Sequence, residues 1–193
     1  MQKQTLAAIK KTASQCILCK LATTRNNVVF GSGNENAKIL IIGEGPGKQE
    51  DLQGVPFIGR SGQLLDLAIK DGLNLKREDL YIANLVKCRP TVDLLFKKDR
   101  PPEPDELASC LPYLYQQIEA IQPSIILSLG APASKTLSGM SKSMTQLRGE
   151  IIERPFGLLL CSWHPSYVLR NGGAGSMKYK DLVSDLEKAG SLV

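Results

Sequence analysis

The order of predicted elements places this chain in the α/β class, with a parallel sheet that carries helices on both faces. Short apolar runs rich in β-branched residues alternate along the chain with longer segments of helical periodicity. Hydrophobic residues make up 42% of the 193 residues, which is enough for a buried core and argues against general disorder. A chain of this length suits one domain, and we expect residues 1–193 to form it.

The first half of the chain predicts two buried strands. A short opening helix begins near Leu6, and the polar stretch 23–37 is typical of a loop. Residues 38–42 predict a strand, because the apolar run there is short, β-branched and ends at Gly43. The spacing of apolar residues over 62–70 predicts an amphipathic helix, and residues 80–86 predict the second strand.

The second half repeats the alternation. We expect a helix over 105–121, a strand over 124–129 and a helix over 131–137. Further strands are predicted at 151–152 and 157–162, followed by a closing helix over 177–188. In parallel sheets ligands bind beyond the carboxyl ends of the strands. Polar segments follow four predicted strands, at 43–51, 84–88, 130–134 and 164–170.

Charge and hydropathy limit the possible partners. The formal net charge of +5 permits a polyanionic partner without requiring one. The first 15 residues lack a long apolar run, so we expect no signal peptide. Apolar runs such as Ile39-Leu40-Ile41-Ile42 are far shorter than the roughly 20 residues of a membrane span. We therefore expect a cytoplasmic protein with no membrane partner.

His164 is the one histidine of the chain, so any imidazole chemistry depends on it. It comes just after the apolar run Leu158-Leu159-Leu160, and Pro165 favours an extended or turn conformation at His164. A strand-end loop is where a sheet presents reactive groups. The alternative is a partly buried structural histidine.

A glycine-rich loop, Gly43-Glu44-Gly45-Pro46-Gly47, directly follows the first predicted strand. Its glycines let the backbone turn tightly and approach a ligand, although an ordinary turn would also explain them. The loop matches neither nucleotide-binding fingerprint, so a nucleotide cofactor is poorly supported. Glu44 places a carboxylate at the strand end, where it can orient water or stabilise a cation.

The five cysteines divide into two groups. Cys16 and Cys19 form a CxxC pair that could share a four-thiolate site with Cys88 and Cys110. Such a set suits zinc or an iron–sulfur cluster, and the spacing does not choose between them. Scattered buried cysteines are the alternative. Cys161 ends an apolar run, and we expect it in the core.

Two further residues fit recognition of a base. Asn84 ends the second predicted strand, and its amide can donate and accept hydrogen bonds together. A structural asparagine that caps a turn is the alternative. Phe57 lies in Val55-Pro56-Phe57-Ile58-Gly59, where it is either a core residue or a platform on which a base stacks.

Taken together, these segments resemble the family-four uracil-DNA glycosylases, the iron–sulfur branch of that superfamily. The resemblance runs from about Cys16 to the final helix. It rests on Gly43-Glu44-Gly45-Pro46-Gly47-Lys48-Gln49-Glu50-Asp51, Pro56-Phe57-Ile58-Gly59-Arg60-Ser61-Gly62-Gln63-Leu64-Leu65, Tyr81-Ile82-Ala83-Asn84-Leu85-Val86-Lys87-Cys88-Arg89-Pro90 and His164-Pro165-Ser166-Tyr167-Val168-Leu169-Arg170.

The resemblance implies a three-layer α/β/α fold with a central four-stranded parallel sheet. It implies a [4Fe–4S] cluster on Cys16, Cys19, Cys88 and Cys110, with a structural role. It also implies hydrolysis of the N-glycosidic bond of deoxyuridine in DNA, a repair reaction that leaves an abasic site. The segment between Cys88 and Cys110 is longer than the family's usual form, with residues 91–100 extra or diverged.

The resemblance and the chemistry together give roles to the site residues. The base must leave the duplex, and we expect uracil to stack on Phe57 and to pair through its O4/N3 edge with Asn84. His164 and backbone amides near Gly45 should stabilise the uracil anion. Glu44 is the candidate for positioning water or stabilising the sugar cation, and Glu50 is the second candidate carboxylate.

DNA contacts follow from the same motifs. We expect them from backbone amides near Ser61-Gly62, Gly130-Ala131 and Ser166, from Arg170, and from the basic residues of the segment 91–100. Leu169, with Tyr167 and Val168, is placed to wedge into the gap left by the flipped base. The expected partner is uracil-containing DNA, single or double stranded, bound by a monomer.

Three other functions fit parts of the sequence. The first is a DNA-binding protein of this fold with a zinc or iron–sulfur site and no base release. The second is a glycosylase for another deaminated base, such as hypoxanthine or xanthine. The third is a nucleotide-dependent enzyme on a flavodoxin-like sheet, which lacks a phosphate fingerprint.

Overall fold

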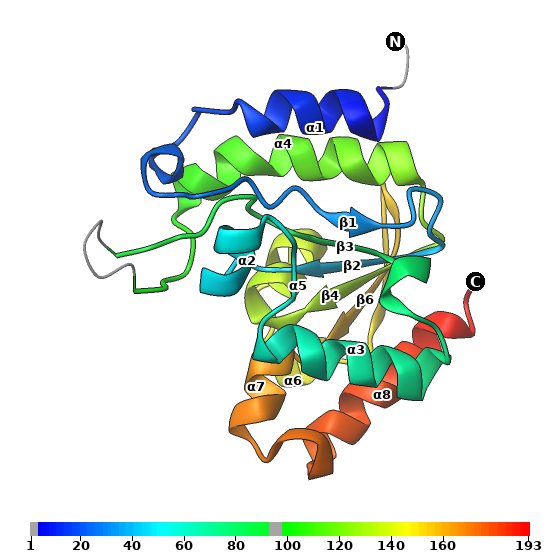
Figure 1. The fold of residues 1–193 in the computed structure, drawn as a ribbon. Coiled ribbons are helices and arrows are strands. Elements are labelled where there is room, and N and C mark those ends of the chain that lie inside the picture. The colour runs from blue at the N-terminus through cyan, green and yellow to red at the C-terminus, as the bar shows by residue number, and fades with distance from the viewer. Residues whose placement is uncertain (1–3, 93–97) are drawn as a thin grey trace.

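A six-stranded sheet forms the centre of the computed structural model, which describes residues 4–92 and 98–193 (Figure 1). The strand order is β1-β3-β2-β4-β6-β5. Neighbours among β3, β2, β4 and β6 run parallel, whereas β1 and β5 pair antiparallel at the two edges. The strands are β1 (Ser32–Gly33), β2 (Ile39–Gly43), β3 (Tyr81–Asn84), β4 (Ile125–Leu129), β5 (Ile151–Arg154) and β6 (Gly157–Ser162).

Helices cover both faces of this sheet, which confirms the α/β class and the three layers (Figure 1). The helices α1 and α4 lie on one face, and α3 and α8 lie on the other. The α-helices are α1 (Leu6–Ser14), α2 (Lys48–Gln53), α3 (Arg60–Leu73), α4 (Pro104–Ile121), α5 (Gly130–Ser138), α6 (Met144–Leu147), α7 (Pro165–Arg170) and α8 (Met177–Gly190). Short 3-10 turns lie at Lys20–Thr23, Arg77–Asp79 and Gly173–Gly175.

The expectation of four strands is wrong, because the sheet has six. The four parallel strands form its centre, and each edge carries an additional antiparallel strand. At one edge, β5 and β6 are joined by Pro155 and Phe156 alone, a connection too short for the crossover that a parallel pair needs. At the other edge, β1 has two residues within the segment expected to be a loop. This strand was not predicted, because it pairs through its main chain and two residues are too few to show a hydrophobic pattern in the sequence.

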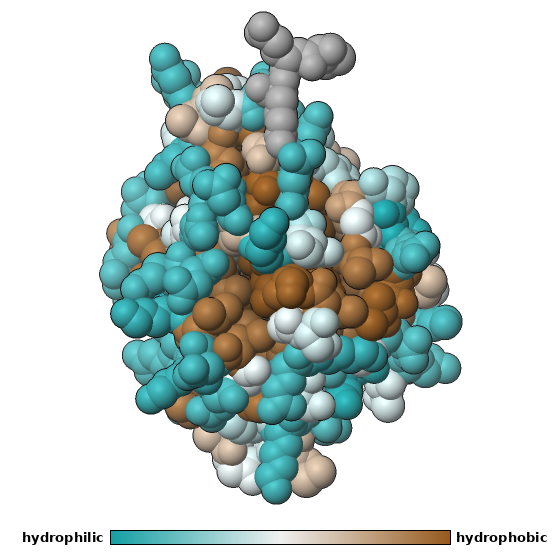
Figure 2. Space-filling view, turned by 90° about the vertical axis from the view of Figure 1, so that its right-hand side faces the viewer, coloured by the Kyte–Doolittle hydropathy of each residue, from teal (hydrophilic) through white to brown (hydrophobic). Residues whose placement is uncertain are grey.

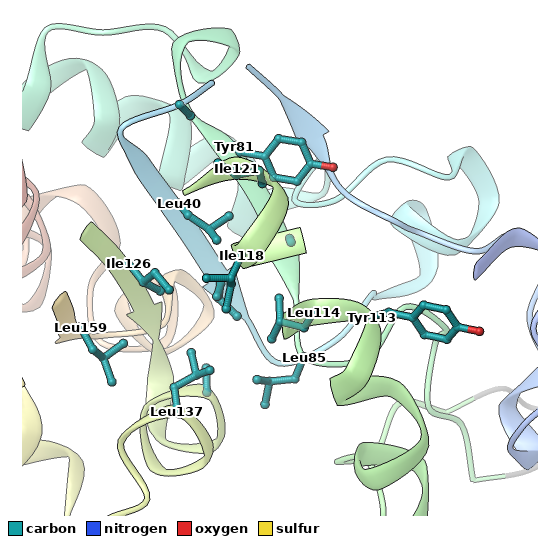
Figure 3. Packing of buried hydrophobic residues seen from close by; sticks show 14 of the residues in the cluster. Leu40, Tyr81, Leu85, Tyr113, Leu114, Ile118, Ile121, Ile126, Leu137 and Leu159 are labelled. Carbon is teal, nitrogen blue, oxygen red and sulfur yellow. The ribbon is translucent and has the colours of Figure 1, made fainter. Parts of the chain in front are cut away.

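Alternate residues of the central strands supply two separate hydrophobic cores. Leu40 and Ile42 of β2 point to the face covered by α1 and α4, and Ile39 and Ile41 point to the face covered by α3 and α8. Because residues of β2 are buried on both faces of the sheet, its sequence is continuously apolar. Figure 3 shows Leu114 and Ile118 of α4 packed toward the sheet, with the hydroxyl group of Tyr113 directed away from the cluster. The labelled side chains of this first core are Leu40, Tyr81, Leu85, Tyr113, Leu114, Ile118, Ile121, Ile126, Leu137 and Leu159.

Three short helices were not predicted, namely α2, α6 and α7. Two of them, α2 and α7, lie in the polar segments expected at strand ends. At the start of α7, His164 is extended, with φ −72° and ψ 135°, as predicted from Pro165. Pro165 then occupies the first helical position, where its missing N–H costs no hydrogen bond. A six-residue helix is too short for its periodicity to be recognised in the sequence.

The strand order creates a crevice beside β2. β2 lies between β3 and β4, so the chain leaves β2 toward one face of the sheet and leaves β4 toward the other. The helix α3 packs into the second core, whereas Ala133 and Leu137 of α5 pack into the first. Loops that diverge in this way open a ligand-binding crevice at the carboxyl ends of the strands.

The opposite end of the molecule, where the parallel strands begin, carries hydrophobic side chains at its surface. Figure 2 looks onto this end and shows them as a brown band between polar residues. Leu75, which precedes β3, and Val193, at the end of the chain, are 38% and 56% exposed. This hydrophobic band lies away from the carboxyl ends of the strands. Among the described residues 4–92 and 98–193, no helix has the length and hydrophobicity needed to cross a membrane.

We expect Gly62→Ala to destabilise the fold, because a Cβ atom at Gly62 would lie 1.8 Å from the carbonyl oxygen of Phe57. The backbone must move to accept the methyl group, at a cost of about 1–3 kcal/mol in the free energy of unfolding. Urea denaturation measures this cost. Gly175→Ala is the matched control, since a Cβ atom at Gly175 meets nothing within 4 Å. Equal stabilities of the two variants would contradict this packing.

Candidate active site

Seven residues line a hollow of about 150 Å³ at the carboxyl ends of β2 and β3. The loop after β2, the segment that enters α3, the end of β3 and the start of α7 each contribute to it. These residues are Gly45, Gly47, Glu50, Phe57, Ser61, Asn84 and His164. We call this hollow the inner pocket. It brings together Asn84, Phe57 and His164, the three residues that the sequence linked to base recognition and catalysis.

Asn84 is the last residue of β3 and is 1% exposed. Its side-chain Oδ1 has no hydrogen-bond partner among the described residues. A buried carbonyl oxygen without a partner costs free energy, so this atom calls for an N–H donor from a ligand. The side chain lies directly against β2, because a Cβ atom on Gly43 would come within 2.6 Å of Oδ1.

Phe57 closes the pocket from the segment before α3. Its φ of 51° lies in the left-handed region, which is unusual for a bulky residue and is retained only where neighbours hold it. Arg77 supplies that hold, because its guanidinium donates to the carbonyl oxygens of Pro56 at 2.6 Å and Phe57 at 2.7 Å. The Phe57 ring then lies 5.7 Å from the His164 ring, centroid to centroid, with a tilt of 35°.

Glu50 holds the same segment from the other side. Its Oε1 accepts hydrogen bonds from the backbone N–H groups of Ile58 at 2.9 Å and Gly59 at 2.8 Å. The carboxylate therefore already satisfies two donors that orient Phe57. Asp66 completes the frame, since its carboxylate pairs with Arg77 at 3.1 Å. Neither was predicted, because Arg77 acts on backbone oxygens about 20 residues away and Asp66 acts through Arg77.

His164 presents a neutral imidazole to the pocket. Burial, together with the positive charge of Arg170, lowers the pKa of His164 to about 4. Its Nδ1 caps α7 by accepting the backbone N–H of Ser166 at 3.1 Å, and the Ser166 hydroxyl lies 2.8 Å away. Since Nδ1 accepts, the single proton of the neutral ring belongs on Nε2, which is then a hydrogen-bond donor.

Two larger hollows flank the mouth of the inner pocket, and Glu44 lines both of them. One, of about 410 Å³, lies between the residues that follow β2 and the segment Asp99 to Pro102. The other, of about 440 Å³, lies beside the start of α5 and includes Trp163 and Tyr167. His164, Ser166 and Arg170 are also shared by the two. Burial raises the pKa of Glu44.

Some of the residues expected to contact DNA line the pockets, and others are buried against the protein core. Ser61 lines the inner pocket, and Ser166 and Arg170 line both outer hollows. Gly62 is buried under the backbone of Phe57, and Leu169 is half-buried against the second core. Part of the basic segment 91–100, including Lys97, lies outside the described residues. The guanidinium of Arg100 pairs at 2.5 Å with Glu106, a buried partner that the sequence did not indicate.

The four cysteines expected to act together line one cavity, together with Lys87 and Arg25. Cys16 and Cys19 follow α1, Cys88 follows β3, and Cys110 lies in α4. Arg25 Nη1 donates to the Cys88 sulfur at 3.5 Å, and the backbone N–H of Lys87 donates to the Cys110 sulfur at 3.2 Å. Such donors stabilise thiolates.

Two properties of the cysteine cavity bear on what it holds. Burial raises the pKa values of Cys19 and Cys110, and it raises that of Cys88 to about 11. Without a bound cation these three thiols stay protonated, so a cationic centre is needed to form their thiolates. Within residues 4–92 and 98–193, no three His, Cys, Asp or Glu side chains converge as they would around a single metal ion. Cys161 is fully buried in the first core, as predicted.

Comparison with known proteins agrees with this architecture. Residues 30–187 match the model of the uracil DNA glycosylase superfamily. A type-4 uracil-DNA glycosylase of Thermotoga maritima is 38% identical over 100% of this chain and 96% of its own length. The type-4 enzyme of Saccharolobus solfataricus is 40% identical over 86% of this chain and 78% of its own. That of Archaeoglobus fulgidus is 34% identical over 98% of this chain and 94% of its own.

The matched region extends from before β1 into α8 and so includes every residue of the inner pocket. The identity to the Thermotoga relative exceeds one third over the whole chain. The chain belongs to the uracil-DNA glycosylase superfamily.

Proposed function

We propose that the protein removes uracil from DNA by hydrolysing its N-glycosidic bond, which leaves an abasic site for repair. The relatives of high identity are type-4 uracil-DNA glycosylases. The observation that carries the proposal is the unpaired Oδ1 of Asn84 in a pocket closed by an aromatic ring. A base that enters this pocket supplies the missing hydrogen bond and stacks on Phe57.

Uracil matches Asn84 along one edge. Its N3–H donates to Oδ1, and its O4 accepts from the side-chain NH2 group. Cytosine has a lone pair at N3 and an amino group at C4, so with the amide held in this orientation both pairings would fail and leave buried groups unsatisfied. A mismatch of this kind is the strongest form of discrimination available to a site built from hydrogen bonds.

The pocket is too deep for a base that remains stacked in a duplex. The target nucleotide therefore rotates out of the helix, or enters from a single strand, with its base in the inner pocket and its backbone in the outer hollows. Ser166 and Arg170 lie in those hollows and contribute polar and positive groups for phosphates. We infer that a monomer acts on both single-stranded and double-stranded DNA.

His164 stabilises the leaving base. As the glycosidic bond breaks, negative charge develops on uracil and positive charge on the sugar. The Nε2–H of a neutral His164 donates to the uracil O2 as that charge grows, and a fixed donor of this type contributes about 2.7–4 kcal/mol to catalysis. The hydrogen bond from Ser166 N–H to Nδ1 keeps the donor aimed at the pocket.

Glu44 acts on the sugar side. It lies at the mouth, in the outer hollows that would hold the deoxyribose, and it does not line the inner pocket. From there a carboxylate can stabilise the developing sugar cation and accept the proton of the attacking water. Glu50 is engaged with the backbone of Ile58 and Gly59, so we assign it the positioning of Phe57 rather than proton transfer.

The cysteine cavity suits a [4Fe–4S] cluster held by Cys16, Cys19, Cys88 and Cys110. The all-sulfur donor set and the N–H groups directed at sulfur fit such a cluster. Tetrahedral zinc, at about 2.3 Å from each sulfur, is the alternative occupant of an all-cysteine site. When bound, the cluster would cross-link α1, β3 and α4, a structural role.

Uracil release from labelled oligonucleotides, single and double stranded, tests the proposed function. We expect release by the wild type and a loss of about 10- to 100-fold in Asn84→Ala, because the base loses its paired hydrogen bonds. Asn36→Ala, at an exposed asparagine, is the matched control and should retain full activity. Release of hypoxanthine or xanthine but not uracil would point to another deaminated base. No release of any base would leave DNA binding alone.

The low pKa of His164 predicts a pH dependence of stability. Between pH 6.5 and pH 4 the unfolded chain binds a proton at His164 that the folded protein excludes, so stability falls as the pH is lowered through this range. We expect wild type to lose about 2 kcal/mol more unfolding free energy than His164→Gln between pH 7 and pH 5. Urea titrations at both pH values measure the difference. Equal losses would show that His164 is not buried in its neutral form.

Cysteine variants separate the cluster from a zinc site. We expect purified protein to be brown and to contain iron and acid-labile sulfide, and Cys88→Ser to lose most of both, because a thiolate ligand is removed. Cys161→Ser is the matched control, since this buried cysteine lies outside the cavity. Colourless protein with one zinc ion per chain would overturn the cluster assignment.

A further inference from the structure

Lys87 is a buried lysine between the inner pocket and the cysteine cavity. It is 2% exposed and lines the cavity together with Cys88 and Cys110. Its Nζ donates to the backbone carbonyl oxygen of Asn84 at 2.8 Å, and its backbone N–H donates to the Cys110 sulfur at 3.2 Å. One residue therefore contacts the strand end that carries Asn84 and a cysteine proposed to bind the cluster.

The ammonium group of Lys87 lacks a carboxylate partner. The ion pairs found in residues 4–92 and 98–193 do not include it, and its hydrogen bond goes to a neutral carbonyl group. A buried cation is strongly destabilising unless negative charge lies nearby. The neighbouring groups that can supply such charge are the sulfurs of Cys88 and Cys110. Four thiolates around a [4Fe–4S] centre carry net negative charge.

The carbonyl contact fixes the peptide that follows Asn84. On the β2 side, the N–H of Leu85 donates to the carbonyl oxygen of Gly43 at 2.9 Å. On the side of the cavity, Lys87 holds the Asn84 carbonyl oxygen. The peptide between Asn84 and Leu85 is thus held at both its polar groups, which determines where the Asn84 side chain leaves the backbone.

We propose that Lys87 is a positioning residue that couples base recognition to the thiolate centre. Its ammonium group balances the negative charge of the cysteine site and at the same time fixes the backbone of Asn84, so that the amide is aligned for uracil. This proposal rests on the proposed function and on the cluster assignment. Lys87 does not touch the substrate and acts through Asn84.

Lys87→Met tests the proposal, because methionine keeps much of the length and removes the charge and the donor. Loss of a nearby positive charge makes reduction of the centre harder, so we expect a more negative midpoint potential in a reductive titration followed by visible absorbance. We expect kcat for uracil release to fall at least tenfold while KM changes less than twofold. The reason is that misalignment of a bound base weakens the transition state more than binding.

Leu85→Val is the matched control for buried packing. Leu85 is fully buried two residues away and lies in the first core. We expect this variant to lose comparable thermal stability while it keeps the wild-type potential and kcat. If Lys87→Met matched Leu85→Val in both potential and kcat, Lys87 would be a packing residue and the proposal would be wrong.

Two other outcomes remain decisive. If Lys87→Met retains no iron, the iron content of Lys87→Gln is compared with that of Leu85→Val. The comparison is made at temperatures where the two variants are equally stable. Iron loss confined to the two lysine variants supports the charge-balancing role, and loss in all three overturns it. If wild type releases no uracil, the proposed function fails, and the potential shift in Lys87→Met then decides the coupling to the thiolate centre by itself.

Discussion

The absence of a side chain at Gly43 is the constraint on which the site depends. A Cβ atom there would lie 2.5 Å from the Phe57 ring and 2.6 Å from Oδ1 of Asn84. The ring and the amide therefore both pack directly on the backbone of β2, from two different segments of the chain. Parallel pairing places Gly43 opposite Asn84, so the register of the sheet itself aligns the two walls of the inner pocket.

Sequence patterns predicted the elements whose burial is regular. The segment of β2 was predicted as a strand because the residues facing each core are apolar. Asn84 was correctly placed at a strand end, although the strand predicted over 80–86 stops at Asn84. Of the two edge strands, β1 escaped prediction because it has only two residues, whereas β5 was predicted at 151–152 and only its antiparallel place in the sheet was not. In the site, Asn84, Phe57 and His164 converge as expected, since strand ends and the segments beside them meet at one edge of the sheet. Gly62 and Leu169 do not, because each packs inward. Arg77 escaped prediction since its partners are main-chain oxygens about 20 residues away, which leave no pattern in the sequence.

The electrostatics of the site follow from where water is excluded. Burial keeps His164 neutral, and because Nδ1 accepts the Ser166 N–H, the remaining ring proton lies on Nε2, which would donate to the base in the proposed mechanism. Glu44 lies outside the inner pocket, where the developing sugar cation rather than the base would be its neighbour. In the proposed mechanism, the acidic group of Glu44 would thereby lie beside the sugar, where positive charge develops. The neutral donor of His164 would lie beside the base, where negative charge develops. In that mechanism, this arrangement would favour the transition state over the ground state.

The spacing along the chain explains why a cysteine site lies so near a base-binding pocket. Asn84 and Cys88 are four residues apart, and the carbonyl of Lys87 between them accepts the N–H of Val29 at 2.7 Å. The segment after β3 is thus held against a neighbouring loop while it passes from the pocket to the cavity. Cys110 attaches the same segment to α4, the helix that covers one core. Any movement of the cysteines relative to the sheet would displace the peptide of Asn84. A centre bound to all four sulfurs, as proposed, would therefore restrain the geometry of base recognition.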